Sequence, residues 1–583
     1  MRAGRLVGNL GLAAGTVWEH LGDDPALLAL QVSRRLPAGA VRPAARAAAQ
    51  MPGVVLPAMA AVIQGRSADA GSLLSGALDT ALRPRSAVRL ADTAIAAGLP
   101  DLAAQLLKAA PERTAGKSGA AARLLWHQGA MTEAVQTLRD GNAAERRQGQ
   151  RLASELRVFE GWAPSLAPVR GYQPRERTVL HLLTNSLPYT GSGYAQRSHS
   201  LLTAQGEQGW NVHAVTRVGY PVQVGQLGAR DTDVLDGVTY HRLLPGRLPR
   251  GMAARLALQA EEVLELALRL RPAVLHTTTH FVNGAVVRAV AHALGIPWVY
   301  EVRGQLADTW ASTRGPKAKN SERYARFTER EAEIMRSADA VATLGEQMLQ
   351  GVLRSGVPET ATVLLPNAVG GDFLTAPLSA ADARRTLGLP PSGMTIGTVS
   401  SLVDYEGIDD LIRAFALLAP EHPDLACLIV GDGASAPALR TLAADLGVGE
   451  RVTFTGRVPR ERAHLHHQAI DVFVVPRKDL DVTRAVTPLK PVEAMACSRP
   501  VIASSLPALG ELVEHGTNGY LVRPEDPAQL AEYIEYLIQD PALRDRLGRD
   551  GREHVLTRRT WHAAAQRSTA LYTDLISSEG HTQ

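Results

Sequence analysis

The sequence predicts an α/β protein with two doubly wound parallel sheets, preceded by an all-helical, solenoid-like region. Three observations lead to this expectation. Residues 1–165 show helical periodicity and almost no strand-like runs, short apolar runs alternate with amphipathic helices from about residue 177, and this alternation restarts after residue 370. A chain of 583 residues is also too long for one hydrophobic core. The expected parts are 1–165, 177–370, 371–555 and a final helix in 556–583.

Composition excludes several protein classes. Hydrophobic residues make up 45% and charged residues 21% of the chain, which is ordinary for a globular protein. No uncharged apolar run reaches the roughly 18 residues that a membrane span needs. The two cysteines, Cys427 and Cys497, are too few for a disulfide framework or a cysteine zinc site. We therefore expect a cytoplasmic protein.

The charge pattern does not favour nucleic-acid binding. The formal net charge is +4, and only six of the 62 basic residues are lysines. The arginines are spread along the chain and aromatic residues make up 4% of it, whereas nucleic-acid binding needs clustered basic residues with aromatics among them. We expect a mild preference for anionic partners and no nucleic acid.

A weak repeat occurs in the helical region. A glycine is followed after five residues by alanine and after nine by leucine, three times, at intervals of 33 and 31 residues. This period is close to that of helix-hairpin solenoids, and chance recurrence in an Ala/Leu-rich stretch is the alternative. Such a region would contact a protein partner or a membrane surface, and packing on the rest of the chain is the alternative. The repeated positions are Gly65, Ala70 and Leu74, then Gly98, Ala103 and Leu107, then Gly129, Ala134 and Leu138.

The first α/β part begins with a strand, a glycine-containing loop and a helix. In the loop, Gly191 and Gly193 permit a tight turn before a helix N-terminus, which suits an anion, and a plain turn is the alternative. Gln196 replaces the third glycine of the dinucleotide-binding pattern, which disfavours NAD. His276 and His280 flank a later strand end and favour a structural or acceptor-side role over zinc binding. The expected strands are 178–184, 211–216, 273–279 and 297–302, and the expected helices are 195–209 and 284–295.

The second α/β part repeats the alternation. A cleft between two such sheets, at the carboxyl ends of their strands, is the natural ligand site. Three histidines at 464–468 lack a carboxylate pattern, and we expect them on an exposed helix without a metal. The expected strands are 394–400, 426–433, 452–456, 470–476 and 500–505, and the expected helices are 407–419, 436–447, 460–468, 488–498 and 508–516.

The segment 474–504 carries the strongest site signal. Thr487 as N-cap and Pro488 as first residue predict a helix start, so that the free N–H groups of Leu489 and Lys490 would face a phosphate. Glu493 follows Lys490 by three residues and lies near the same face. Arg477 and Lys478 arrive from the preceding strand end. A surface Lys490–Glu493 pair on an ordinary helix is the alternative.

Residues 177–575 resemble the family 4 retaining glycosyltransferases of the GT-B fold. The resemblance is carried in order by TGSGYAQRSH, VYEVRGQLADTW, SADAVATLGEQM, LLPNAV, YEGIDDLIRAF, IVGDGAS, VTFTGRVP and TPLKPVEAMACSRPVIAS. The resemblance implies two Rossmann-like domains, a nucleotide-sugar donor held by the second and an acceptor facing the first. It also implies that the last helix, with Trp561 and Tyr572, crosses back onto the first domain.

The family pattern assigns roles to residues of this chain. Glu493 matches the second glutamate of the signature and would accept hydrogen bonds from the donor ribose. Gly191 and Gly193 match the donor-diphosphate or acceptor loop of the first domain. Arg303 falls where many members place a catalytic-side His or Asp, which implies an acceptor-side position. Gly456 and Val458 match the segment whose backbone reads the donor base.

Three positions depart from the family pattern. The first signature glutamate falls on Ala485, and the usual phosphate-binding Arg and Lys fall on Ser401 and Glu406. From their positions in the family pattern, we still expect Ser401 and Glu406 at the donor site. Arg477 and Lys490 are placed to supply the missing positive charge, which a diphosphate leaving group requires. The YEG and TPLKP forms resemble a branch of the family in which this exchange occurs.

We therefore expect a retaining hexosyltransferase that moves a sugar from a nucleotide diphosphate to a glycan or lipid-linked acceptor. No Asp-x-Asp pattern stands in a convincing place, so neither a metal nor a further cofactor is expected. The enzyme would serve bacterial polysaccharide or glycoconjugate synthesis, in the cytoplasm or at the inner face of the membrane. The alternatives are an inactive binding scaffold of the same fold, consistent with Ala485, and another sugar-nucleotide enzyme such as an epimerase.

Overall fold

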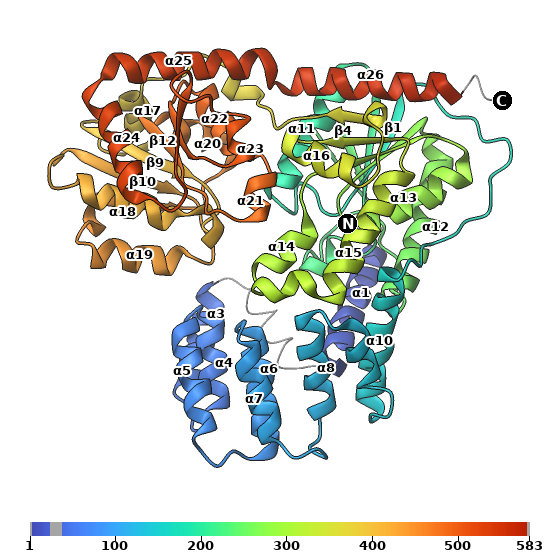
Figure 1. Ribbon diagram of the computed structural model, residues 1–583. Helices are drawn as coiled ribbons and strands as arrows, with labels where there is room; N and C mark the ends of the chain where they lie inside the picture. The colour runs from blue at the N-terminus through green and yellow to red at the C-terminus, as the bar shows by residue number, and fades with distance from the viewer. Residues whose placement is uncertain (1–2, 24–37, 580–583) are drawn as a thin grey trace.

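The computed structural model describes residues 3–23 and 38–579. A helical region lies beside the first of two α/β domains, and two consecutive helices at the C-terminal end lead from the second domain onto the first (Figure 1). This arrangement confirms the predicted fold class. The helical region consists of α1 (Ala3–Asp23), α3 (Ala38–Ala49), α4 (Val55–Ile63), α5 (Ser67–Leu78), α6 (Pro84–Ala96), α7 (Pro100–Ala109), α8 (Lys117–Gln128), α9 (Met131–Gln136) and α10 (Ala143–Phe159).

The three glycines of the sequence repeat end three equivalent helices. Gly65, Gly98 and Gly129 follow α4, α6 and α8 with φ of 72°, 77° and 87°, a backbone region that favours glycine. Each repeat makes the same C-terminal hydrogen bond, and the alanine and leucine positions are buried against neighbouring helices. The bonds run from the N–H of Arg66, Leu99 and Ala130 to the carbonyls of Ala61, Ala94 and Leu125, at 2.9 Å each.

The first α/β domain is built on an eight-stranded sheet of order β3-β4-β2-β1-β5-β6-β7-β8, parallel except for the β3–β4 pair. Its helices cover both faces. The strands are β1 (Thr178–Leu183), β2 (Asn211–Thr216), β3 (Thr232–Leu235), β4 (Val238–His241), β5 (Val274–Thr278), β6 (Trp298–Val302), β7 (Ala340–Thr343) and β8 (Thr362–Leu364). The helices are α11 (Gly193–Glu207), η1 (Val222–Val224), α12 (Met252–Leu270), α13 (Phe281–Leu294), α14 (Leu306–Ser312), η2 (Pro316–Asn320), α15 (Glu322–Ser337), α16 (Glu346–Arg354) and η3 (Glu359–Ala361).

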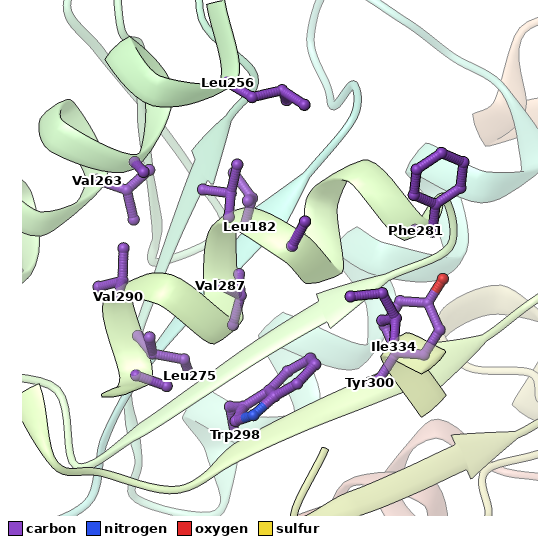
Figure 2. Packing of buried hydrophobic residues seen from close by; sticks show 14 of the residues in the cluster. Leu182, Leu256, Val263, Leu275, Phe281, Val287, Val290, Trp298, Tyr300 and Ile334 are labelled. Carbon is purple, nitrogen blue, oxygen red and sulfur yellow. The ribbon is translucent and has the colours of Figure 1, made fainter. Parts of the chain in front are cut away.

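The core of this domain lies between the sheet and the pair α12–α13. The apolar side chains of α12 and α13 meet those of β1, β5 and β6 (Figure 2). β1, β5 and β6 are buried along their whole length because both faces of the sheet are covered. Residues seen in this layer are Leu182, Leu256, Val263, Leu275, Val287, Val290 and Trp298.

The second α/β domain has a parallel six-stranded sheet of order β11-β10-β9-β12-β13-β14. Its strands are β9 (Met394–Val399), β10 (Leu425–Val430), β11 (Val452–Gly456), β12 (Val472–Val475), β13 (Val501–Ser504) and β14 (Gly519–Val522). Its helices are η4 (Gly371–Leu374), α17 (Ala380–Leu387), η5 (Asp404–Glu406), α18 (Ile408–Leu418), η6 (Gly449–Arg451), α19 (Ala436–Asp445), η7 (Arg460–Arg462), α20 (Ala463–Gln468), α21 (Asp481–Ala485), α22 (Lys490–Ala496), α23 (Pro507–Gly510), α24 (Pro527–Gln539) and α25 (Pro541–Arg558).

The last helix, α26 (Trp561–Glu579), follows α25 and lies on α11 of the first α/β domain (Figure 1). Tyr572 is buried there, and its hydroxyl accepts a hydrogen bond from Gln205 Nε2 at 3.0 Å. Trp561 packs with α11 near the crossover, where its N–H donates to Val369. None of the described helices has the length and apolar character that a membrane span requires.

The helical region is fastened to the first α/β domain. α10 packs against α12 and α15. The N–H of Thr132 donates to Glu322 at 2.8 Å, and the N–H of Arg323 donates to the carbonyl of Gly129 at 3.0 Å. The Arg323 guanidinium also lies over the rings of Trp126 and Trp310. The last helical repeat therefore holds the start of α15.

Candidate active site

The candidate site lies at the carboxyl edge of the second sheet, where the strand order reverses. β9 has β10 on one side and β12 on the other, and open α/β sheets bind ligands outside their strand ends at such a point. The loop after β9 leads to Glu406, the loop after β12 contains Arg477, and α22 begins with Lys490. The fold thus brings together three residues that the sequence singled out.

Glu406, Arg477 and Lys490 form a compact ion triad. Arg477 donates Nε and Nη2 to the two oxygens of Glu406, both at 3.1 Å, and Lys490 Nζ lies 2.5 Å from Glu406 Oε1. Arg477 Nη1 also donates to the carbonyl of Val486 at 3.0 Å. With one carboxylate between two cations, the triad carries a net charge of +1, which suits an anionic ligand.

Burial and charge act in opposite directions on this triad. Burial of Glu406 raises the pKa of its carboxyl, but Lys490 and Arg477 outweigh this effect and lower it to about 2. Burial lowers the pKa of Lys490, and the nearby Glu406 carboxylate raises it in part. Glu406 was predicted to bind the donor, yet both its oxygens are taken by cations, so it orients Arg477 and Lys490.

The helix after this loop begins later than the sequence predicted. α22 starts at Lys490 with Leu489 as N-cap, so Thr487 is not its cap and Pro488 is not its first residue. Pro491 at the second position fits the first turn, where a missing N–H costs nothing. The carbonyl of Thr487 instead accepts from Asn367 Nδ2 at 2.8 Å, which ties the loop to the segment joining the two domains.

Glu493 lies one turn beyond Lys490 and is partly open to solvent. Arg460 Nη1 lies 3.9 Å from Glu493 Oε1, and His467 Nε2 lies 3.4 Å from Glu493 Oε2. The expectation of an exposed histidine-rich helix is wrong here, because His466 and His467 are both buried. His467 stacks on Phe473 of the sheet. The sequence of this helix has few apolar residues and therefore gave no sign that it is buried.

Lys478 does not join the triad. Its Nζ donates to Asp409 at 3.0 Å and to Asp410 at 2.7 Å, both at the start of α18. The side chain therefore turns away from Glu406 although it directly follows Arg477 in the chain.

The glycine loop of the first domain leads into α11. Gly193 begins α11, and Ser192 caps that helix by accepting from the N–H of Ala195 at 3.3 Å. Neither Gly191 nor Gly193 has a positive φ, so the turn does not require glycine at either position. The absence of side chains leaves open space there.

Two tyrosines, one from each domain, lie where the two domains approach each other. Tyr194, at the start of α11, is 51% exposed, and its hydroxyl donates to the carbonyl of Arg303 at 3.4 Å. In the second domain, burial and the Glu406 carboxylate raise the pKa of Tyr405, on which Arg477 and Tyr194 also act. Burial raises the pKa of Tyr194, and Arg303 and Arg477 lower it in part, so the start of α11 lies within electrostatic reach of the triad.

Three further predicted residues lie along the carboxyl edge of the second sheet. Ser401 is exposed on the loop after β9. Gly456 ends β11 with φ of 73°, and its carbonyl accepts from the N–H of Gly431 at 3.0 Å. Val458 packs partly buried against the domain core.

Arg303 and His276 lie in the interior of the first domain and not on its cleft surface. Arg303 donates to Glu301 at 2.5 Å and to Ser198 at 2.6 Å, and His276 lies 2.5 Å from the Tyr572 hydroxyl. Burial raises the pKa of Glu301, but Arg303 and Arg197 hold it well below its usual range. The acceptor-side assignment of Arg303 and His276 is thus replaced by a structural one, because this buried carboxylate and α26 take their polar atoms.

Two contacts across the domains were not anticipated from the sequence. Glu511 of the second domain caps α16 of the first by accepting from the N–H groups of Glu346 and Gln347 at 3.0 and 2.8 Å. Lys319 forms an ion pair with Asp481 of α21. An interdomain cap joins residues 165 positions apart and leaves no local signal in the sequence. Within the described residues, no group of three or more His, Cys, Asp or Glu side chains could hold a metal ion.

Comparisons with known proteins agree with the two-domain fold. The family profile for glycosyl transferases group 1 matches residues 380–554, and that for the glycosyl transferase 4-like domain matches residues 192–368. The D-inositol 3-phosphate glycosyltransferase 1 of Catenulispora acidiphila is 30% identical over 309 residues, 51% of this chain and 71% of the relative. The D-inositol 3-phosphate glycosyltransferase of Thermobispora bispora is 31% identical over 228 residues, 38% of this chain and 51% of the relative.

The chain therefore spans about half the length of the second of these relatives. Among solved structures, HepE from Anabaena in complex with UDP and glucose has a TM-score of 0.52 at 17% identity, covering 68% of this chain and 99% of that one. This similarity concerns the fold.

Proposed function

This chain belongs to the group 1 glycosyltransferases, and from this membership we propose that it transfers a sugar from a nucleotide diphosphate to a glycan or lipid-linked acceptor. The observation that carries the proposal is the Arg477–Glu406–Lys490 triad. It concentrates a net positive charge at the strand ends where a nucleotide diphosphate binds in this type of sheet.

The donor would lie along the carboxyl edge of the second sheet. Lys490 and Arg477 would bind the diphosphate, and Glu493 would accept hydrogen bonds from the ribose hydroxyls. The backbone around Gly456 and Val458 would read the base. The loop at Gly191 and Gly193, together with Ser401, Thr487 and Leu489, would border the sugar and diphosphate.

In the reaction, negative charge develops on the departing diphosphate. The two cations would stabilise it without a metal ion, and Glu406 would hold them in place. We propose retention of the anomeric configuration through an oxocarbenium-like transition state. Ala485 removes one signature carboxylate, and the charge supplied by Arg477 and Lys490 supports the YEG/TPLKP-type branch as a functional variant.

The acceptor would approach from the first α/β domain, near Tyr194. The helical region would serve as the contact for a protein partner or the membrane surface, in the cytoplasm or at the inner membrane face, during bacterial polysaccharide or glycoconjugate synthesis. The close packing of the last helical repeat on α15 supports a role for this region next to the catalytic domains.

The direct test of donor binding is a thermal-shift panel with UDP, GDP, ADP, CMP and dTDP. One nucleotide should raise the melting temperature of the wild type, because a ligand that binds only the native state stabilises it. Glu493→Ala should abolish this shift, and Glu450→Ala, on the exposed turn η6, should retain it. If no nucleotide shifts the wild type, the proposed donor site is wrong.

A further inference from the structure

His467 is a buried histidine whose polar atoms have no evident purpose in the fold. Its side chain is fully buried, its ring stacks on Phe473 with centroids 5.1 Å apart, and Phe373 meets it edge-on at 5.8 Å. Neither ring nitrogen has a hydrogen-bond partner within residues 3–23 and 38–579. Leaving a buried polar group unpaired costs stability, so such a group in a native fold calls for an explanation.

The nearest acceptor is the carboxylate of Glu493. His467 Nε2 lies 3.4 Å from Oε2, and Arg460 Nη1 lies 3.9 Å from Oε1. Each carboxylate oxygen is thus faced by one basic group. Both groups come from the single stretch 460–467, which leads from β11 towards β12.

We propose that His467 is a positioning residue that fixes the Glu493 carboxylate to accept both hydroxyls of the donor ribose. The inference rests on the proposed function, in which Glu493 binds that ribose. In this role the ring would donate Nε2–H to Oε2, which lies 3.4 Å away in this structure. Phe473 and Phe373 pack against the ring and restrict its orientation.

This arrangement makes the site selective for a ribose with both the 2′- and the 3′-hydroxyl. A carboxylate oxygen has two lone pairs, so Oε2 can accept from His467 and from one hydroxyl at the same time. A carboxylate held in one orientation presents both oxygens to the diol, and a 2′-deoxyribose leaves one of them unpaired. Without His467 the carboxylate rotates and one hydroxyl suffices. Selectivity for ribose over deoxyribose is therefore the property that His467 controls.

The test compares the dissociation constants of UDP with 2′-deoxy-UDP and of GDP with 2′-deoxy-GDP by calorimetry. The wild type should prefer the ribonucleotide by roughly tenfold or more, the usual worth of a hydrogen bond to a charged group. His467→Phe keeps the ring stack but lacks the donor, and should reduce the preference to about threefold or less. His467→Gln keeps an N–H donor and should recover part of it. His466→Phe, at the neighbouring buried ring, should keep the wild-type ratio.

The outcomes separate the inference from the function on which it rests. If His467→Phe keeps the wild-type ratio while Glu493→Ala loses it, His467 does not position the carboxylate, and the proposed donor site stands. If the wild type itself shows no preference for ribose, or binds neither pair, the assignment of Glu493 fails and the inference fails with it. Should His467→Phe not fold, a wild-type ratio in a folded His467→Ala would equally overturn it.

Discussion

At the scale of single residues, the candidate site joins one glutamate and two cations that the sequence had marked as a charge exchange. The sequence indicated that Glu406 stands where the family has a cation, and that Arg477 and Lys490 could replace the lost charge. The structure adds that the three side chains contact one another. This partnership could have been inferred from the exchange itself, because a buried carboxylate needs cations beside it. The role of His467 could not, because its partner lies on another helix.

Glu406→Gln should destabilise the protein in a pH-dependent way. The folded-state pKa of about 2 lies below the ordinary 4.5, so the carboxylate stabilises the fold above about pH 4.5, and this contribution is lost as the pH falls towards 2. We expect the variant to lose about 3 kcal/mol of unfolding free energy at pH 7, and much less near pH 3. Denaturant titrations at both pH values measure this.

The matched control for Glu406→Gln is Glu450→Gln, a carboxylate on the exposed turn η6. It should change the unfolding free energy by less than about 0.5 kcal/mol at either pH. An equal loss at pH 7 and pH 3 in Glu406→Gln would show that the ion triad is not the source of the effect.

At the scale of elements, strand and helix order were predictable and helix ends were less so. Alternating apolar runs placed the strands because both faces of each sheet are covered. The start of α22 was predicted two residues early, since Thr487 and Pro488 form a good local start signal. The contact of Thr487 with Asn367 overrides that signal. The glycine repeat, in contrast, is local, and Gly65, Gly98 and Gly129 each end a helix.

Alanine substitutions at two glycines of the helical region should have opposite effects. Gly98 has φ of 77° with nothing near its Cβ position, so Gly98→Ala pays only the backbone cost of about 1 kcal/mol. Gly76 lies exposed inside α5 with equally open space, so Gly76→Ala should stabilise by about 0.5–1 kcal/mol. Hydrogen exchange of α4–α7 measures both. If both substitutions change the stability in the same direction, the assigned helix end at Gly98 is contradicted.

At the scale of the whole molecule, segments far apart in the chain supply side chains to each other's domains. α26 supplies Tyr572 to the interior of the first domain, and Glu511 of the second domain caps α16 of the first. The two-sheet architecture was predictable because it follows from repeated local patterns. The buried network of Arg303, His276 and Tyr572 was not, since it depends on how the C-terminal helix packs.

Tyr572→Phe should weaken the first domain although residue 572 lies beyond the end of the second. The phenylalanine fills the same space but leaves His276 Nδ1 and one contact of Gln205 unsatisfied. We expect a loss of about 1–2 kcal/mol and faster hydrogen exchange in β1 and β5. Tyr536→Phe, at a 46% exposed tyrosine, should change little. If β1 and β5 exchange as in the wild type, α26 does not stabilise that sheet.

The measurement that tests the central claim most directly is the turnover of nucleotide-diphosphate sugars by the wild type, Lys490→Met and Lys478→Met. The two lysines lie close in the chain, but Lys490 contacts Glu406 whereas Lys478 contacts Asp409 and Asp410. We predict that one donor is consumed, that Lys490→Met lowers kcat by roughly 100- to 1000-fold, and that Lys478→Met stays within a few-fold of the wild type. Wild-type turnover by Lys490→Met, or no turnover of any donor by the wild type, would contradict the account.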